Sequence, residues 1–321
     1  MCTDLPRLSY LYYLKREGSS NLTKHQFDLI YIRFQIFIMP LRLSNKVIQN
    51  KIENLCFVNC VLQLLGAVEE FRTFFSSALP LWTESQKKTP VACELSRIFS
   101  SRRVISAWHL RSMVSIYDNK PYLSNGEQQD AEEFLRSLFN VLEKEFKLIN
   151  STSGLDLLNK FHGIEQTEKW FEKECKICHY KPENRSVPFF NLTLFIVDCG
   201  NKNLQNLIDD HFHQLETLQM RCACVPHKPN SNVFKKTHVD KEPKYLVIEL
   251  RRYLTREDSK STNTIHADQQ IFLKSHGNKY ELASVIDHDG LSISGGHYTA
   301  QVYDGKCWTN ASEFVLKLEI A

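Results

Sequence analysis

The sequence predicts an α+β fold in which helices dominate the N-terminal half and strands dominate the C-terminal half. In three segments before residue 147, apolar residues recur at the three- and four-residue spacing of a helix. After residue 185, the chain instead contains short runs rich in β-branched and aromatic residues. Because helices precede strands rather than alternating with them, the pattern favours an α+β architecture over a doubly wound sheet.

Each expected element follows from its own pattern. The three helices are expected at Cys56–Phe75, Val91–Phe99 and Asp130–Phe146, each with an apolar stripe along one face. Strands are expected at Phe189–Val197, Tyr245–Leu250, Tyr280–Val285, His297–Tyr303 and Phe314–Leu318. The polar segment Thr255–Asp268 lacks periodicity and is expected to be a mobile loop.

Composition excludes several classes of protein. The 321 residues are 42% hydrophobic and 24% charged, which argues against wholesale disorder. A net charge of +3 makes electrostatic binding to nucleic acid or a membrane surface an unexpected main function. No signal peptide is expected at Met1–Leu14, and charged residues interrupt the apolar segment Phe27–Leu41, so no membrane span is expected there. Nothing indicates an oligomer.

Ten cysteines are too few for a disulfide scaffold in a chain of this length. They are better explained as metal ligands, a nucleophile and small buried apolar residues. Thiolates of both kinds require reduced sulfur. The sequence therefore predicts an intracellular protein, cytoplasmic or nuclear.

Cys56 stands where a helix is expected to begin. Asn54 is a suitable N-cap, which would put Cys56 in the first helical turn. Exposed backbone amides and the helix dipole stabilise negative charge at that position, and a thiolate is the nucleophilic form of cysteine. Cys60, one turn later, is expected to pack as a small apolar residue. Taken alone, the spacing also fits a structural role for Cys56.

His297 lies in a predicted β-hairpin. The pair Asp304-Gly305 between two strand-like runs is a strong signal for a two-residue turn. That turn would set Thr299 opposite Asn310 and His297 opposite Ser312, on one face of the sheet. Asn310 would then be a diagonal neighbour of His297, able to hydrogen-bond the imidazole and fix its orientation. The alternative is an ordinary surface histidine.

Two cysteine pairs suggest a zinc site. The four candidate ligands are Cys175, Cys178, Cys222 and Cys224. The second pair has one intervening residue rather than two, so His227 or His179 is an alternative ligand. The remaining possibility is a degenerate site held by packing without metal.

Together these segments resemble the ubiquitin-specific protease family of cysteine deubiquitinases. Asn54–Gln63 resembles the family's cysteine box, and Gly126–Leu135 resembles its Gln-Asp-Ala-x-Glu-Phe box. Pro243–Tyr253 resembles the strand before the first blocking loop. His288–Gly290 followed by Gly295–Tyr298 resembles the second blocking loop and the histidine box. The boxes occur in family order over about residues 47 to 320.

The resemblance implies a papain-like cysteine protease core with a helical thumb, a β-sheet palm and β fingers. The catalytic domain would span 47–321, with a fingers insertion at about 165–242 that carries the cysteine pairs. Residues 1–46 would be an N-terminal extension of unknown role. Ubiquitin and ubiquitinated proteins are the implied partners. No cofactor is implied for catalysis, and zinc would be structural.

The resemblance also implies residue roles. Cys56 would attack the carbonyl after ubiquitin's last glycine, His297 would act as the base, and Asn310 would orient His297. Asp130 would meet the basic tail of ubiquitin, although alone it reads as a helix N-cap. The implied substrate-binding residues are Asp130, Gly295, Gly296 and Tyr298, the two glycines forming a narrow channel.

Three positions depart from the family pattern near Cys56. Lys51 stands where the family usually has the asparagine that donates to the oxyanion; Glu53 and Leu55 replace a usual glycine and threonine. Asn50, Asn54 or the Lys51 ammonium could replace the missing donor. Besides an active deubiquitinase, two readings stay open. One is an impaired pseudo-deubiquitinase that binds ubiquitin or acts as a scaffold. The other is a zinc-supported interaction module or a protease for another ubiquitin-like modifier.

Overall fold

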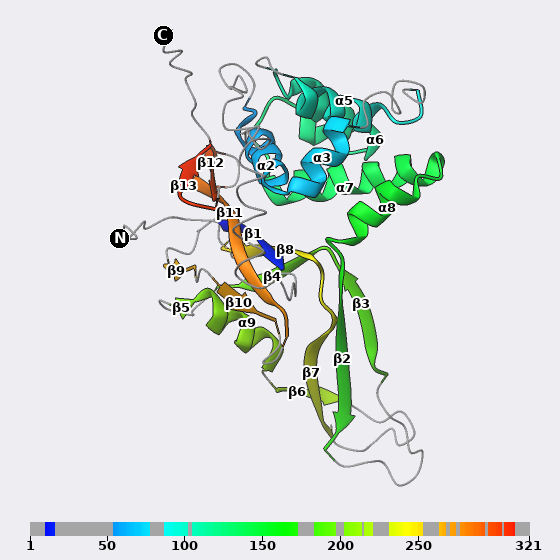
Figure 1. The fold of residues 1–321 in the computed structure, drawn as a ribbon. Helices are drawn as coiled ribbons and strands as arrows, with labels where there is room; N and C mark the ends of the chain where they lie inside the picture. The colour runs from blue at the N-terminus through cyan, green and yellow to red at the C-terminus, as the bar shows by residue number, and fades with distance from the viewer. Residues whose placement is uncertain are drawn as a thin grey trace, which may run out of the picture.

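The computed structural model describes most of the chain after residue 53 and one strand before it. The described residues are 10–16, 54–77, 87–101, 105–172, 183–196, 202–213, 215–220, 231–252, 263–267, 270–273, 277–292, 295–303 and 305–311. Within them, a helical layer lies on a seven-stranded sheet, and a narrow four-stranded sheet projects away from both (Figure 1). The α+β prediction is confirmed.

The helices before residue 160 form one layer. They are α2 (Cys56–Ala67), α3 (Glu69–Ser77), α5 (Pro90–Ser100), α6 (Trp108–Tyr117), the 3₁₀ helix η2 (Pro121–Ser124), α7 (Ala131–Leu148) and α8 (Thr152–Asn159). The predictions for α5 and α7 are confirmed. The single helix expected over Cys56–Phe75 is wrong: Val68 adopts an extended backbone, with ψ 101°, and separates α2 from α3. The sequence patterns did not predict α6 and α8.

The helix α7 shows how sequence sets the position of the layer. Asp130 caps it, because its Oδ1 accepts hydrogen bonds from Glu132 N at 2.8 Å and Glu133 N at 3.0 Å. Its buried stripe packs against α2, where the rings of Phe134 and Phe57 meet edge to face at 5.6 Å. The beginning of α7 is thereby held beside α2.

The larger sheet has the strand order β13-β12-β11-β1-β8-β4, with β10 paired to β11. Its strands are β1 (Tyr10–Arg16), β4 (Asn191–Phe195), β8 (Tyr245–Arg251), β10 (Gln270–Phe272), β11 (Lys279–Ser292), β12 (Gly295–Tyr303) and β13 (Trp308–Asn310). The strands predicted for β8, β11 and β12 are confirmed. The run Phe189–Val197 contains β4 and the end of another strand, separated at Phe190. The strand expected at Phe314–Leu318 lies outside the described residues.

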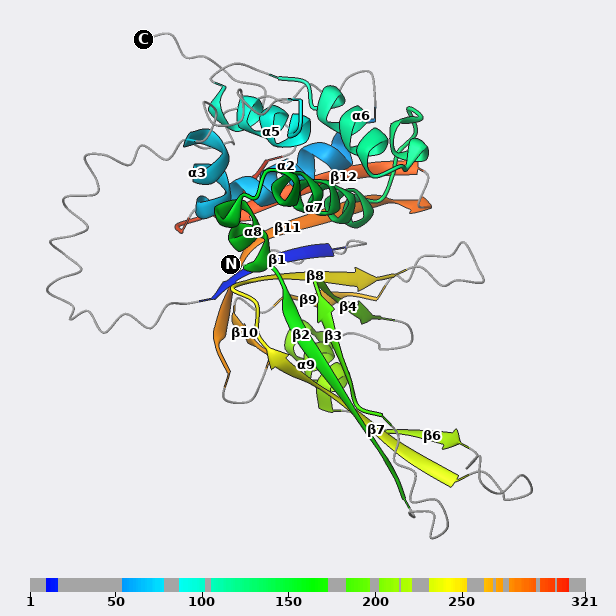
Figure 2. The same cartoon turned by 90° about the vertical axis from the view of Figure 1, so that its right-hand side faces the viewer.

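A segment of the N-terminal extension belongs to this sheet. β1 lies between β8 and β11 and pairs antiparallel with both (Figure 2). It therefore supplies the hydrogen-bonding partners of two strands that would otherwise be edges. The domain boundary near residue 47 stays a prediction.

The smaller sheet has the strand order β3-β2-β7-β6. Its strands are β2 (Gly163–Phe171), β3 (Arg185–Phe189), β6 (Glu216–Met220) and β7 (Ser231–Lys241). It is built from the predicted fingers segment, but that segment also contains β4 and α9 (Leu204–His213), which pack with the larger sheet. In the expected loop Thr255–Asp268, the described residues include a short strand, β9 (Ile265–His266), paired with β5 (Lys202–Asn203).

Two hydrophobic cores cover the two faces of the larger sheet. One joins α2, α3, α5, α6 and α7 to residues of β8, β11 and β12. The other joins α9 to β4, β8, β10 and β11. Within the described residues, no helix is long and apolar enough to cross a membrane.

Candidate active site

Cys56 is the first residue of α2 and is only 5% exposed. The prediction that it occupies the first helical turn is confirmed. The prediction that Asn54 is the N-cap is wrong, because Leu55 occupies that position and Asn54 has a left-handed backbone with φ 46°. No side chain in the described part of the chain caps this helix start. The first backbone N–H groups of α2, including that of Cys56, therefore lack partners within the helix.

The Asn54 side chain instead ties two loops together. Its Nδ2 donates to the carbonyl oxygen of Gly126 at 3.0 Å. This bond joins the segment before α2 to the loop that leads into α7. The role as an oxyanion donor that Asn54 was expected to offer stays a prediction.

A buried arginine makes further ties between the same two loops. Arg111, on α6, donates to the carbonyl oxygens of Leu123, of Glu127 at 2.6 Å, and of Asn54 at 3.5 Å. Its guanidinium lies 5.0 Å from the centre of the Phe57 ring. One cation thus holds the entry to α2 against the entry to α7.

The loop that leads into α7 places Gln128 against Cys56. Gln128 Nε2 donates to Cys56 Sγ at 3.5 Å, and the glutamine side chain is only 6% exposed. The local sequence pattern around Gln128 does not by itself predict this contact. The available signal was its position in the Gly126–Leu135 box, two residues before Asp130.

The structure brings the strand of His297 next to the helix of Cys56. α2 packs against β12 (Figure 1), and Tyr298 and Ala300 of β12 share a buried cluster with Cys56. His297 is half-buried, and its Nε2 is buried without a hydrogen-bond partner among the described residues. Among the described residues, the hydrogen bond to Cys56 Sγ comes from Gln128.

The predicted position of Asn310 relative to His297 is wrong. β12 and β13 are joined by a four-residue loop, and Asn310 pairs with Gln301 rather than with Thr299. A shift of two residues leaves Asn310 on the same face as His297. However, the four residues from His297 to Gln301 span about 13 Å along a strand, which is too far for a hydrogen bond. The Asp-Gly signal correctly indicated a hairpin but not its loop length.

The residue directly opposite His297 is Asp289, on β11. Directly opposed residues in an antiparallel pair share a face, with Cβ atoms about 5 Å apart. Among the described residues His297 Nε2 has no hydrogen-bond partner, so a bond from the imidazole to Asp289 is a prediction that rests on this register. Asp289 is thus a second residue whose position was not predicted, although it lies in the segment resembling the second blocking loop.

Of the residues predicted to bind substrate on β12, Gly295 and Gly296 are exposed, whereas Tyr298 is buried. Gly296 has φ 149°, and a Cβ there would lie 2.6 Å from His288 Nε2, so no larger residue fits. Tyr298 is buried, with its ring 4.4 Å from that of His288. Gly295 pairs with Ser292 at the turn between β11 and β12. Substrate binding by these residues stays a prediction.

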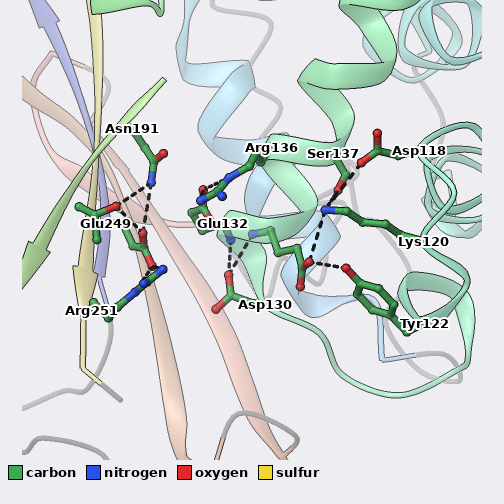
Figure 3. Close-up of polar contacts among 12 residues, drawn as sticks. Asp118, Lys120, Tyr122, Asp130, Glu132, Arg136, Ser137, Asn191, Glu249 and Arg251 are labelled. Carbon is green, nitrogen blue, oxygen red and sulfur yellow. Dashed lines mark hydrogen bonds and ion pairs between the residues drawn. The ribbon is translucent and has the colours of Figure 1, made fainter. Parts of the chain in front are cut away.

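Acidic side chains of α7 and β8 lie close to one another, as Figure 3 shows. Burial raises the pKa of Asp130, and Glu249 on β8 adds to the rise. Burial likewise raises the pKa of Glu132 to about 7, with Arg136 opposing the shift and Glu249 increasing it. Thus three carboxylates influence one another between the helical layer and the sheet.

Glu249 is held on the sheet side of this cluster by its neighbours. It accepts hydrogen bonds from Thr193 at 2.8 Å and from Asn191 at 3.2 Å, both on β4. Arg251 on the same strand donates to it at 3.3 Å. Only Asp130 of the cluster was a predicted site residue. The approach of Glu132 and Glu249 depends on contacts between distant parts of the chain.

The remaining predicted site residues lie outside the described residues. They are Lys51, Cys175, Cys178, Cys222, Cys224 and His227. Among the residues that the structure does describe, no group of histidine, cysteine or acidic side chains is arranged to hold a metal. The zinc site therefore stays a prediction.

Comparison with known proteins identifies similar chains. The family model described as ubiquitin carboxyl-terminal hydrolase matches residues 48–315. Ubiquitin carboxyl-terminal hydrolase Usp2 of Drosophila melanogaster is 25% identical over 292 residues, covering 78% of this chain and 30% of that protein. Human ubiquitin carboxyl-terminal hydrolase 2 is 26% identical over 292 residues, covering 77% of this chain and 47% of that protein. The chain thus spans less than half the length of these two relatives.

Solved structures share the fold. The SAGA Ubp8/Sgf11/Sus1/Sgf73 DUB module bound to ubiquitin aldehyde contains a chain with a TM-score of 0.67 and 21% identity. The match covers 92% of this chain and 72% of that chain. A second structure of that module, bound to monoubiquitin, gives a TM-score of 0.64 at 20% identity, over 92% of this chain and 71% of that one.

Proposed function

We propose that this chain is a thiol-dependent deubiquitinase. The premise is that the chain belongs to the ubiquitin carboxyl-terminal hydrolase family, as a ubiquitin-specific protease. It would hydrolyse the isopeptide or peptide bond after the C-terminal glycine of ubiquitin. The observation that carries the proposal is the position of Cys56. It is the first residue of a buried helix, and that helix packs against the strand of His297.

The proposed reaction is acyl transfer through a thioester. His297 takes the proton of Cys56, and the thiolate attacks the carbonyl carbon, moving one electron pair onto the oxygen. When this oxyanion collapses, the carbon–nitrogen bond breaks, and the leaving amine takes the proton from His297. Water, deprotonated by His297, then cleaves the thioester and restores the thiol. The backbone N–H of Cys56 is one donor to the oxyanion.

The acidic cluster of Asp130, Glu132 and Glu249 supports binding of a basic peptide between the helical layer and the sheet (Figure 3). Carboxylates pair with arginine side chains in a fixed orientation, so they would direct a basic ubiquitin tail toward Cys56. The ubiquitin and ubiquitin aldehyde bound in the SAGA module structures support the same class of partner. A working thiolate also favours a reducing, intracellular location.

Structural zinc in the smaller sheet is part of this proposal. β2 ends at Phe171 and β6 contains Leu218, and both residues pair with Val233 of β7. The segments leading to Cys175 and to Cys222 therefore start from the same end of the sheet. Four sulfur ligands are the donor set that zinc favours in structural sites.

A second candidate function is a pseudo-deubiquitinase that binds ubiquitin without cleaving it. Two observations favour it. Asn310 is too far along the sheet to orient His297, and Lys51 stands where the family usually has an oxyanion-donating asparagine.

The deciding experiment is the reaction with ubiquitin carrying a C-terminal propargylamide, under reducing conditions. We expect a covalent adduct on wild-type protein, its loss in Cys56→Ala, and its retention in Cys307→Ser, which alters an exposed cysteine. If wild-type protein binds ubiquitin but forms no adduct, the pseudo-deubiquitinase is the correct function.

A further inference from the structure

We propose that the side-chain amide of Gln128 is a catalytic hydrogen-bond donor to the oxyanion formed on the carbonyl that Cys56 attacks. The inference rests on the proposed function. It assigns the role of oxyanion donor to Gln128, because Lys51 stands where the family usually has the asparagine that donates. It starts from the hydrogen bond that Gln128 Nε2 donates to Cys56 Sγ at 3.5 Å.

The geometry places this amide where the negative charge develops. In the tetrahedral intermediate, the carbon that bears the oxyanion is bonded directly to Cys56 Sγ. A donor that already reaches Sγ is therefore within a small rotation of the oxyanion. The amide would pass from the sulfur to the oxygen as charge moves from one to the other. An interaction with the oxyanion is stronger in the transition state than in the bound substrate, so it accelerates the chemical step.

The amide is also held in place before substrate binds. Asn54 donates to Gly126 O, and Arg111 donates to Glu127 O, which fixes the two residues that precede Gln128. Two residues after it, Asp130 caps α7 through two backbone N–H groups. A donor fixed on both sides requires little reorganisation during the reaction.

Burial increases the effect of this donor. Gln128 is 6% exposed, so little water competes for its N–H groups or screens the charge. The backbone N–H of Cys56, the first residue of α2, has no partner within the helix. The side-chain amide and this backbone amide form a two-donor site around the sulfur atom.

The test compares Gln128→Leu with wild-type protein in three reactions. The first measures kcat and KM on ubiquitin with a fluorogenic C-terminal amide. The second measures inhibition by ubiquitin aldehyde, whose hemithioacetal oxygen occupies the oxyanion position. The third measures alkylation of Cys56 by a neutral haloacetamide, which has no oxyanion. Gln129→Leu is the matched control, because Gln129 hydrogen-bonds Asn125 rather than Cys56.

We expect Gln128→Leu to lower kcat by roughly 10²- to 10³-fold. Inhibition by ubiquitin aldehyde should weaken by a similar factor. KM and the alkylation rate should stay within about threefold of wild type, because neither involves the oxyanion. Gln128→Glu, which keeps the shape but removes the donor, should be at least as slow. Adding Lys51→Asn to Gln128→Leu should restore part of the lost kcat. Retained thermal unfolding and ubiquitin binding would show that the variants fold.

Several outcomes would overturn the inference. A rise in KM at constant kcat would mean that Gln128 only binds the ubiquitin tail. A fall in alkylation equal to the fall in kcat would mean that it only holds the thiol. Unchanged kinetics would mean that it has no role in the reaction. If wild-type protein itself does not react with ubiquitin propargylamide, the proposed function fails, and the inference fails with it. Failure of the inference alone requires an active wild type.

Discussion

Replacing Glu132 with glutamine should make stability less dependent on pH. Glu132 is 8% exposed, and burial raises its pKa from an ordinary value of 4.5 to about 7, despite an ion pair with Arg136 at 2.6 Å. At 1.36 kcal/mol per pKa unit, the shift corresponds to about 3 kcal/mol of unfavourable free energy when the carboxylate is charged in the folded protein.

The sign follows from proton binding. The pKa of Glu132 is higher in the folded protein than in the unfolded chain, so the folded protein binds more protons between pH 4.5 and 7. Stability therefore falls as pH rises through this window, and the loss is complete above pH 7. Glutamine stays neutral at every pH. The free energy of unfolding of Glu132→Gln minus that of wild type should therefore rise from near zero at about pH 4.5 to about 3 kcal/mol at pH 8.

Urea denaturation at a series of pH values, in reducing buffer, measures this difference. Burial also raises the pKa of Glu145 to about 7, so the variant retains part of the pH dependence. The matched control is Glu143→Gln on the same helix, since Glu143 is 49% exposed and pairs with Lys147. Its effect should stay within about 0.5 kcal/mol of wild type at every pH. A free-energy difference for Glu132→Gln that does not change with pH would refute the reasoning.

Three further predictions concern the histidine, the metal and the N-terminal strand. Asp289→Ala should lower kcat on a ubiquitin substrate at least tenfold, roughly the scale of a lost orienting group. Asn310→Ala should change kcat by less than about threefold. A larger loss in Asn310→Ala than in Asp289→Ala would restore the role first predicted for Asn310. Purified protein should contain one zinc per chain by elemental analysis and lose it in Cys175→Ser, whereas a zinc-free, fully folded wild type would contradict the site. Deleting residues 1–16 should yield aggregated protein, because β8 and β11 lose their shared neighbour; a soluble truncation with an unchanged unfolding temperature would contradict this.

Local patterns predicted the elements best where burial agrees with the period of the element. The stripe of α7 was visible because residues three and four positions apart share one buried face. The run of β8 was visible because both of its faces are buried, and β12 because burial alternates along it. The break at Val68 was not visible, because apolar residues at helical spacing continue on both sides of it. β1 was also missed, since a strand is recognised from its partners as much as from its own residues.

The candidate site divides in the same way. Cys56 and His297 were identified from their local sequence, and the structure brings their elements into contact. Gln128 was not identified, because its approach to Cys56 depends on Arg111 and Asn54 tying two loops together. Asp289 was not identified, because the register between β11 and β12 decides which residue faces His297.

The sequence by itself determined the family and the α+β class, and it singled out Cys56 and His297 as candidates, because each of these signals comes from residues close together in the chain. Only the tertiary structure decided which side chain contacts Cys56 Sγ, how far Asn310 lies from His297, and that residues 10–16 complete the sheet. The physical reason is the range of the interactions. Helical spacing and turn residues act over a few positions, whereas loop closure, strand register and carboxylate burial depend on packing between distant segments.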